Sequence, residues 1–91
     1  MRQTEMTETE LTFRKNIVWL RLYHHYRISD VAKKTGINAS SYSHLERLQY
    51  SVKPSFSVFE KLANLYNIKV TDLFIPQWEN GDLLLPPHDE I

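Results

Sequence analysis

Residues 31–47 read VAKKTGINASSYSHLER, and they decide the fold because they encode two short helices joined by a tight turn. Ala32 is small, so a second helix can cross the first closely at that point. Gly36 follows four residues later and suits the left-handed conformation that ends a helix. Asn38 is then a good N-terminal cap for the next helix. This stretch predicts a pair of helices meeting at an angle.

Apolar periodicity predicts three further helices around this pair, and strand signals are weak. Phe13, Ile17, Leu20 and His24 recur at helical spacing and would form the inner face of the first helix. Ser55, Asn67 and Thr71 are expected to mark helix ends in the second half of the chain. The predicted fold is all-α, with helices over about Thr12 to His25, Ile28 to Thr35, Asn38 or Ala39 to Leu48, Ser55 to Asn67, and Asp72 to Ile75.

Length and composition exclude several classes of protein. A chain of 91 residues makes about one domain, too short for a nucleotide-binding or barrel enzyme. It has no cysteine, which excludes disulfides, thiol catalysis and cysteine-ligated zinc. His24 and His25 are adjacent and point to different sides of a helix, so we expect no metal. With no catalytic motif, we also expect no cofactor and no enzyme. No apolar run reaches the roughly 20 residues of a membrane span, and no signal core is present, so we expect a cytoplasmic protein.

The zero net charge of the chain hides an uneven distribution. Residues 11–71 hold ten bases and three acids, a net charge of +7. The first ten residues carry a net charge of −2, and residues 72–91 hold five acids and no base. A basic middle between acidic ends favours a body that binds a polyanion, although a helical domain with solvated lysines would have the same charge count.

The sequence from about Phe13 to Phe74, roughly two-thirds of the chain, resembles the lambda-repressor-like (Cro/CI-type, XRE) helix-turn-helix family. The resemblance rests on many elements in the right order: Ile17, Leu20 and Arg21 in the first helix; Val31, Ala32 and Gly36 in the second; Leu45, Glu46 and Arg47 in the third; then Pro54, Ser55, Phe59, Leu62, Ala63, Ile68, Asp72, Leu73 and Phe74.

This resemblance implies a five-helix bundle containing the helix-turn-helix over residues 11–76, with an N-terminal extension (1–10) and a C-terminal tail (77–91). Three positions depart from the family pattern. Arg27 replaces the usual Ser or Thr cap, so Ser29 is expected to cap the second helix two residues late. Ile28 replaces a polar residue that can touch phosphate. Leu48 replaces a glycine in a loop about two residues longer than usual.

The resemblance makes the third helix the recognition helix that lies in the major groove of DNA. Its exposed positions would contact base edges: Ala39, Ser40, Ser41, Ser43 and His44. None of these is Arg, Lys or Gln, so discrimination by hydrogen bonds would be soft. The residues expected to contact phosphates are Arg14, Lys33, Lys34, Asn38, Arg47, Tyr50 and Lys53. Arg21 and Glu46 match a family ion pair between the first and third helices.

The predicted function is sequence-specific binding of double-stranded DNA by a transcriptional repressor in a bacterium or phage. A homodimer would present two recognition helices about 34–36 Å apart to a near-palindromic operator. The alternative is a protein-interaction module, an antitoxin or adaptor with a regulatory protein partner and DNA binding secondary. Residues 27–32 also resemble the start of the MerR-type family, but a long helix precedes them and no winged continuation follows.

The first helix carries more apolar residues than one core face needs. Val18, Trp19, Leu22 and Tyr23 are expected to lie partly outside that face. The tail offers matching apolar residues in Trp78 and three consecutive leucines, Leu83–Leu85. We therefore expect the tail to cover the first helix, within one chain or across a dimer, on the side away from DNA.

Overall fold

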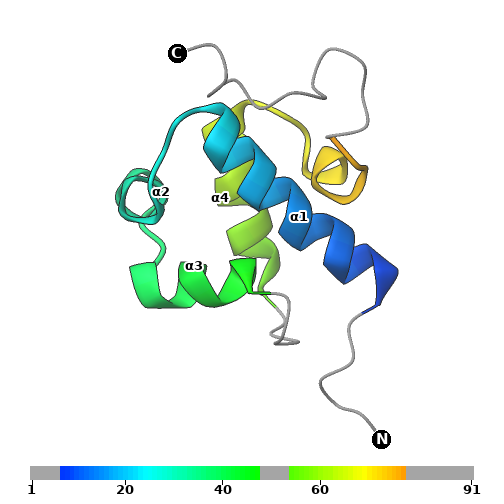
Figure 1. Ribbon diagram of the computed structural model, residues 1–91, viewed down its shortest axis with the longest axis horizontal. Coiled ribbons are helices and arrows are strands. Elements are labelled where there is room, and N and C mark those ends of the chain that lie inside the picture. Colours follow the sequence, from blue (N-terminus) through cyan, green and yellow to red (C-terminus); the bar gives the residue numbers. More distant parts are fainter. Residues whose placement is uncertain (1–6, 48–53, 78–91) are drawn as a thin grey trace, which may run out of the picture.

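The computed structural model describes residues 7–47 and 54–77, and this part of the chain is helical, with no strand (Figure 1). It contains α1 (Glu8–Tyr23), α2 (Ile28–Thr35), α3 (Ala39–Glu46), α4 (Phe56–Tyr66) and a 3-10 helix, η1 (Val70–Phe74). The all-α prediction agrees with this architecture. The predicted fifth α-helix is wrong, because a five-residue 3-10 helix takes its place.

The first helix begins at Glu8, four residues before the predicted start, because Thr7 and Glu10 form a capping box. The Thr7 hydroxyl accepts a hydrogen bond from the Glu10 backbone N–H at 3.1 Å, and the Glu10 carboxylate accepts one from the Thr7 N–H at 2.9 Å. The last residues of the expected N-terminal extension therefore belong to α1.

The next helix, α2, has its predicted bounds, and its ends are fixed by Asp30 and Gly36. The Asp30 carboxylate accepts a hydrogen bond from the Arg27 N–H at 2.8 Å, so α2 starts at Ile28 and the expected late cap at Ser29 is wrong. Gly36 ends the helix at a φ of 80°, the left-handed conformation that glycine adopts without strain.

The caps of α3 and α4 are the predicted ones. Asn38 caps α3 by accepting hydrogen bonds from the Ser40 and Ser41 N–H groups. This helix ends at Glu46, earlier than predicted, because Arg47 is extended. Ser55 caps α4, and Asn67 ends it in a left-handed conformation.

The 3-10 helix begins one residue after Lys69, whose N–H donates to the Asp72 carboxylate at 3.1 Å. Thr71, the predicted cap, therefore lies inside the element. The start of η1 is set by the backbone N–H that the Asp72 carboxylate accepts from, which is that of Lys69 three residues earlier. The sequence alone does not show which N–H that will be.

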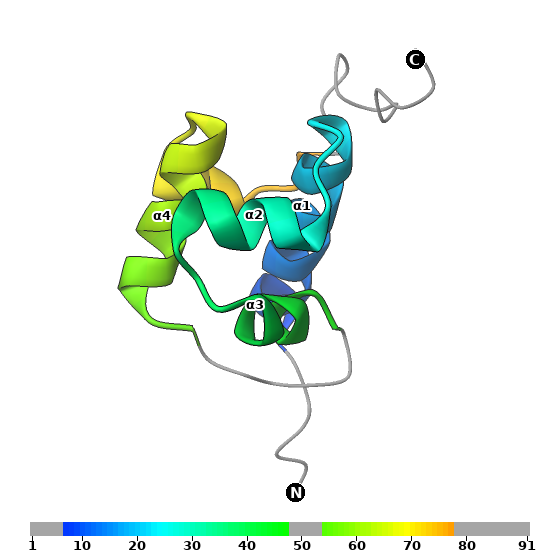
Figure 2. The ribbon, with the colours of Figure 1, turned by 90° about the vertical axis from the view of Figure 1, so that its left-hand side faces the viewer.

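The core takes buried residues from α1, α2, α3, α4 and η1, and Figure 2 shows α2 between α1 and α4 with α3 along one end. Trp19 is 9% exposed, so the expectation that it adds to an open apolar surface outside the first core face is wrong. Its ring stacks on that of Tyr23, with ring centroids 5.0 Å apart.

No helix in the described ranges is long and apolar enough to cross a membrane. The buried apolar residues are Phe13, Ile17, Trp19, Leu20, Val31, Ile37, Tyr42, Leu45, Leu62, Ala63, Tyr66 and Leu73.

Candidate nucleic-acid interface

The outer side of α3 is polar and open to solvent, while its inner side is part of the core. Tyr42 and Leu45 are buried. The residues expected to contact base edges lie on the other side: Ala39, Ser40, Ser41 and His44 are exposed, and Ser43 is partly buried. Ser40 and His44 are one turn apart and project from the same strip of the helix. The helix therefore presents hydroxyl and imidazole groups on a short, accessible surface.

A hollow of about 170 Å³ lies between this side of α3 and the start of α4. Ser41 and His44 line it from α3, and Pro54 and Val58 line it from the other side. Ile37 and Leu45 complete the lining, so its wall combines the polar groups of α3 with apolar side chains from several elements. A ligand that lay along α3 would contact both helices here.

The residues expected to contact phosphate are distributed around α3. Lys33 and Lys34 are exposed in the last turn of α2, and the Lys34 ammonium lies 5.2 Å from the centre of the Tyr26 ring. Asn38 and Arg47 are exposed at the two ends of α3. Tyr50 and Lys53 lie outside the described residues.

Arg14 is the exception, because it is 1% exposed and cannot meet a phosphate from where it lies. One guanidinium nitrogen donates to the backbone carbonyls of His44, Leu45 and Arg47 at 3.0, 2.6 and 3.3 Å. These carbonyls belong to the C-terminal end of α3, where the partial negative charge of the helix collects. Burial lowers the pKa of this guanidinium, and the Glu10 carboxylate partly offsets the effect. The expected phosphate contact is corrected to a brace between α1 and α3.

Arg21 and Glu46, the expected ion pair, lie together as a two-pronged contact between α1 and α3. Arg21 Nε and one terminal nitrogen donate to the two carboxylate oxygens at 2.7 and 2.9 Å. The Tyr42 hydroxyl donates to the same carboxylate at 2.5 Å, and Arg21 also donates to the Tyr26 carbonyl at 3.1 Å. The hydrogen bonds that Arg21 donates to Glu46 raise the pKa of Arg21, and burial followed by the Glu46 charge raises the pKa of Tyr42.

These two arginines fix α3 from behind. Arg14 and Arg21 are seven residues apart, about two turns, and so share one side of α1. That spacing was the sequence signal that could have linked Arg14 to α3 instead of to phosphate. Because hydrogen bonds are directional, the pair sets the orientation of α3 as well as its distance from α1.

A family model described as helix-turn-helix matches residues 17–73, more than half of the chain. The match runs from the middle of α1 to η1 and includes all of α2, α3 and α4. Searches among curated proteins and among solved structures gave no match.

Proposed function

Because the chain belongs to the helix-turn-helix family, as a DNA-binding protein of the lambda-repressor-like, XRE kind, we propose that it is a sequence-specific repressor that uses α3 as its recognition helix. The observation that carries the proposal is the contrast within α3. Its inner side is fixed by Arg14 and Arg21, while its outer side exposes Ser40, Ser41 and His44. A rigid helix with an open polar side is the arrangement that reading the major groove requires.

The proposed interface contains two sets of contacts, one to base edges and one to phosphates. Ala39, Ser40, Ser41, Ser43 and His44 contact base edges, with serine hydroxyls bonding several bases and the imidazole donating to guanine. Lys33, Lys34, Asn38 and Arg47 contact the phosphate backbone, together with Tyr50 and Lys53. The Asn38 side-chain oxygen is used in the cap, so its amide nitrogen would make that contact.

The repressor would act as a homodimer in the cytoplasm of a bacterial or phage-infected cell and occlude a promoter. Two copies place their α3 helices in successive major grooves of a near-palindromic operator. Selection from genomic fragments followed by footprinting identifies the operator and the spacing of its half-sites. A footprint covering two half-sites about one helical turn apart supports the dimer, and a single half-site contradicts it.

Salt dependence tests whether the protein binds DNA through phosphates. If a dimer neutralises about six phosphates, affinity falls roughly a thousandfold between 50 and 200 mM salt. The measurement is fluorescence anisotropy with the selected duplex and with random duplex. An affinity that stays constant with salt contradicts DNA binding as the main function.

Substitutions separate base contacts from phosphate contacts. We expect His44→Ala to change which sequence is selected, and Lys33→Ala to weaken all sequences alike. Lys69→Ala is a matched control, because Lys69 is exposed and directly precedes η1, an element that packs on α1 and α4. If His44→Ala selects the wild-type operator, His44 does not read bases.

The second candidate function is a protein-interaction module, in which a regulatory protein and not DNA is the main partner. It is favoured by the outer side of α3, where residues 39–44 include no Arg, Lys or Gln. The exposed Phe56 at the start of α4 is a further apolar contact point. The salt series distinguishes the two functions, since only DNA binding requires counterion release.

A further inference from the structure

The four phenylalanines of the chain gather on one side of the fold, and the pocket beside three of them is also lined by Arg14. Phe13, Phe59 and Phe74, from α1, α4 and η1, lie with ring centroids 5.1 to 5.7 Å apart. Phe56 stands beside them, 6.3 Å from Phe59, and is 62% exposed. Phe56 therefore extends the apolar surface of this cluster into solvent.

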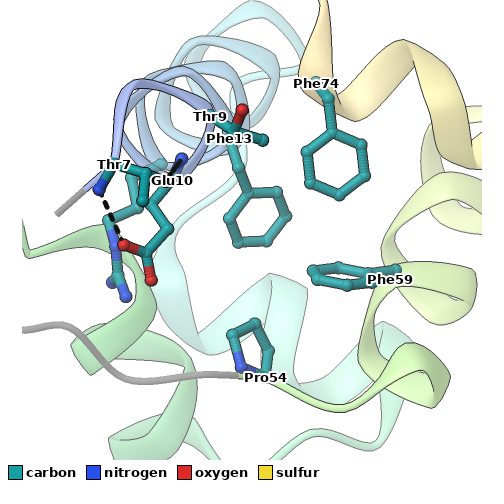
Figure 3. Close-up of a pocket in the computed structure, with 8 residues that line it drawn as sticks. Thr7, Thr9, Glu10, Phe13, Pro54, Phe59 and Phe74 are labelled. Atoms are coloured by element: carbon teal, nitrogen blue, oxygen red, sulfur yellow. Dashed lines mark hydrogen bonds between the residues drawn. The ribbon is translucent and has the colours of Figure 1, made fainter.

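A pocket of about 250 Å³ opens beside these rings, and we call it the phenylalanine pocket (Figure 3). Phe13, Phe59 and Phe74 point into it, Pro54 lies below, and Thr9 and Glu10 form part of its rim. Small-molecule sites usually measure about 300–1,000 Å³. This pocket is below that range and mostly apolar, so it fits one or two aliphatic side chains better than a larger ligand.

The tail of the chain leaves the described structure next to this pocket. The Gln77 N–H donates to the side-chain oxygen of Asn16 at 2.9 Å, and Gln77 is 8% exposed. Asn16 is one helical turn from Phe13, and Gln77 follows Phe74 by three residues. Asn16 also donates to the Leu73 and Ile75 carbonyls, so α1 holds the chain firmly at this exit.

We propose that the leucine run Leu83–Leu85 of the same chain docks in the phenylalanine pocket. Leu83 is six residues beyond Gln77, and six residues of extended chain span up to about 20 Å. Asn16 and Phe13 are separated by about 4.5 Å along α1, so the run can reach the pocket with chain to spare. The pair Asn80-Gly81, between Gln77 and Leu83, is typical of a tight turn. Such a turn would direct the leucines back toward η1.

The structure favours this pocket over the outer side of α1, where the sequence alone placed the tail. Trp19, the largest apolar side chain expected there, is already buried, and Leu22 at 39% exposure is the one large apolar side chain of α1 among the described residues that is exposed. The phenylalanine pocket is lined by three aromatic rings and lies at a place the tail can reach. Glu10 on its rim and Asp82 before the leucines carry like charges, so burial of apolar surface and not attraction between charges must drive the docking.

The docking is tested by NMR on the full chain without DNA. We expect nuclear Overhauser contacts between the methyl groups of Leu83–Leu85 and the ring protons of Phe13, Phe59 or Phe74. Thr9→Trp should remove these contacts, because the larger ring fills the pocket mouth from an exposed position. Glu8→Trp is the matched control on the same turn, since Glu8 is exposed and outside the pocket lining.

The salt dependence separates this inference from the proposed function. The contacts should persist between about 50 and 200 mM salt, a range over which DNA affinity should fall. Absence of methyl-to-ring contacts in the wild-type chain overturns the proposal, and so does their survival in Thr9→Trp. Contacts that appear only between differently labelled copies in a mixed sample overturn docking within one chain and identify a second copy as the occupant.

Discussion

The two sides of α1 are built from different chemistry. The side toward α3 carries Arg14 and Arg21, each nearly or largely buried and each donating several hydrogen bonds. The side toward α4 and η1 carries Phe13, which packs against two other phenylalanine rings. Hydrogen bonds require particular directions, whereas apolar burial depends mainly on area.

The difference indicates that one side of α1 mainly stabilises the fold, while the other mainly orients α3. Apolar packing on the phenylalanine side supplies burial that tolerates small changes of shape. The arginine side holds α3 at a defined angle, and loss of one partner there would leave a buried charge or carbonyl without its hydrogen bond. Substitutions on the two sides should therefore differ in both size and kind of effect.

The largest effect is expected from Arg21→Ala. It leaves the Glu46 carboxylate largely buried without its cation, which should cost about 3–5 kcal/mol of unfolding free energy. Urea unfolding measures this. The double variant Arg21→Ala/Glu46→Ala should lose less than the sum of the two single variants, because both charges are then gone. A melting curve of Arg21→Ala that matches wild type would show that the pair contributes nothing to stability.

The second effect is expected from Arg14→Met, which keeps the length of the side chain but removes its donors. The α3 carbonyls lose their hydrogen bonds, and we expect a loss of about 2–3 kcal/mol. DNA affinity should fall because α3 is less well held, while the slope of affinity against salt stays unchanged. A slope reduced by about one would mean that Arg14 does contact phosphate after all.

The sequence predicted those parts of the fold that depend on local signals. The bounds of α2 followed from apolar spacing and Gly36, and the caps of α3 and α4 followed from Asn38 and Ser55. The start of α1 has a local signal too, Thr7 with Glu10 three residues later, but the family resemblance begins only at Phe13 and implies an extension over residues 1–10.

Tertiary contacts decided what local signals could not. Arg14 is basic, so charge alone favours a phosphate contact. Its burial depends on carbonyls that α3 presents about thirty residues later. Trp19 is likewise buried, although the spacing of Phe13, Ile17 and Leu20 places it outside the first core face. The base contacts of α3 stay a prediction, since exposure shows accessibility and not readout.

A smaller effect is expected on the phenylalanine side. Phe59→Leu keeps an apolar side chain next to Phe13 and Phe74 and should cost about 1 kcal/mol. The selected DNA sequence should not change, because this side does not orient α3. Phe56→Leu, at the exposed position, is the control and should stay within about 0.5 kcal/mol of wild type. A change of operator preference in Phe59→Leu would contradict the separation of the two sides.

The smallest effect is expected from His24, which follows α1 directly and begins the loop that leads to α2. Its ring packs against Tyr23, Tyr26 and Tyr66, with centroids 5.1 to 5.7 Å away. Burial, and then the neighbouring His25, lower the pKa of His24 below its ordinary 6.5. The folded state therefore binds fewer protons than the unfolded state as the pH falls below about 6.5, so stability should decrease there. Because His24 is exposed on one side, the change is small. Between about pH 7 and pH 5, the free energy of unfolding should decrease less steeply for His24→Gln than for wild type. Equal slopes would mean that protonation of this ring is not coupled to folding.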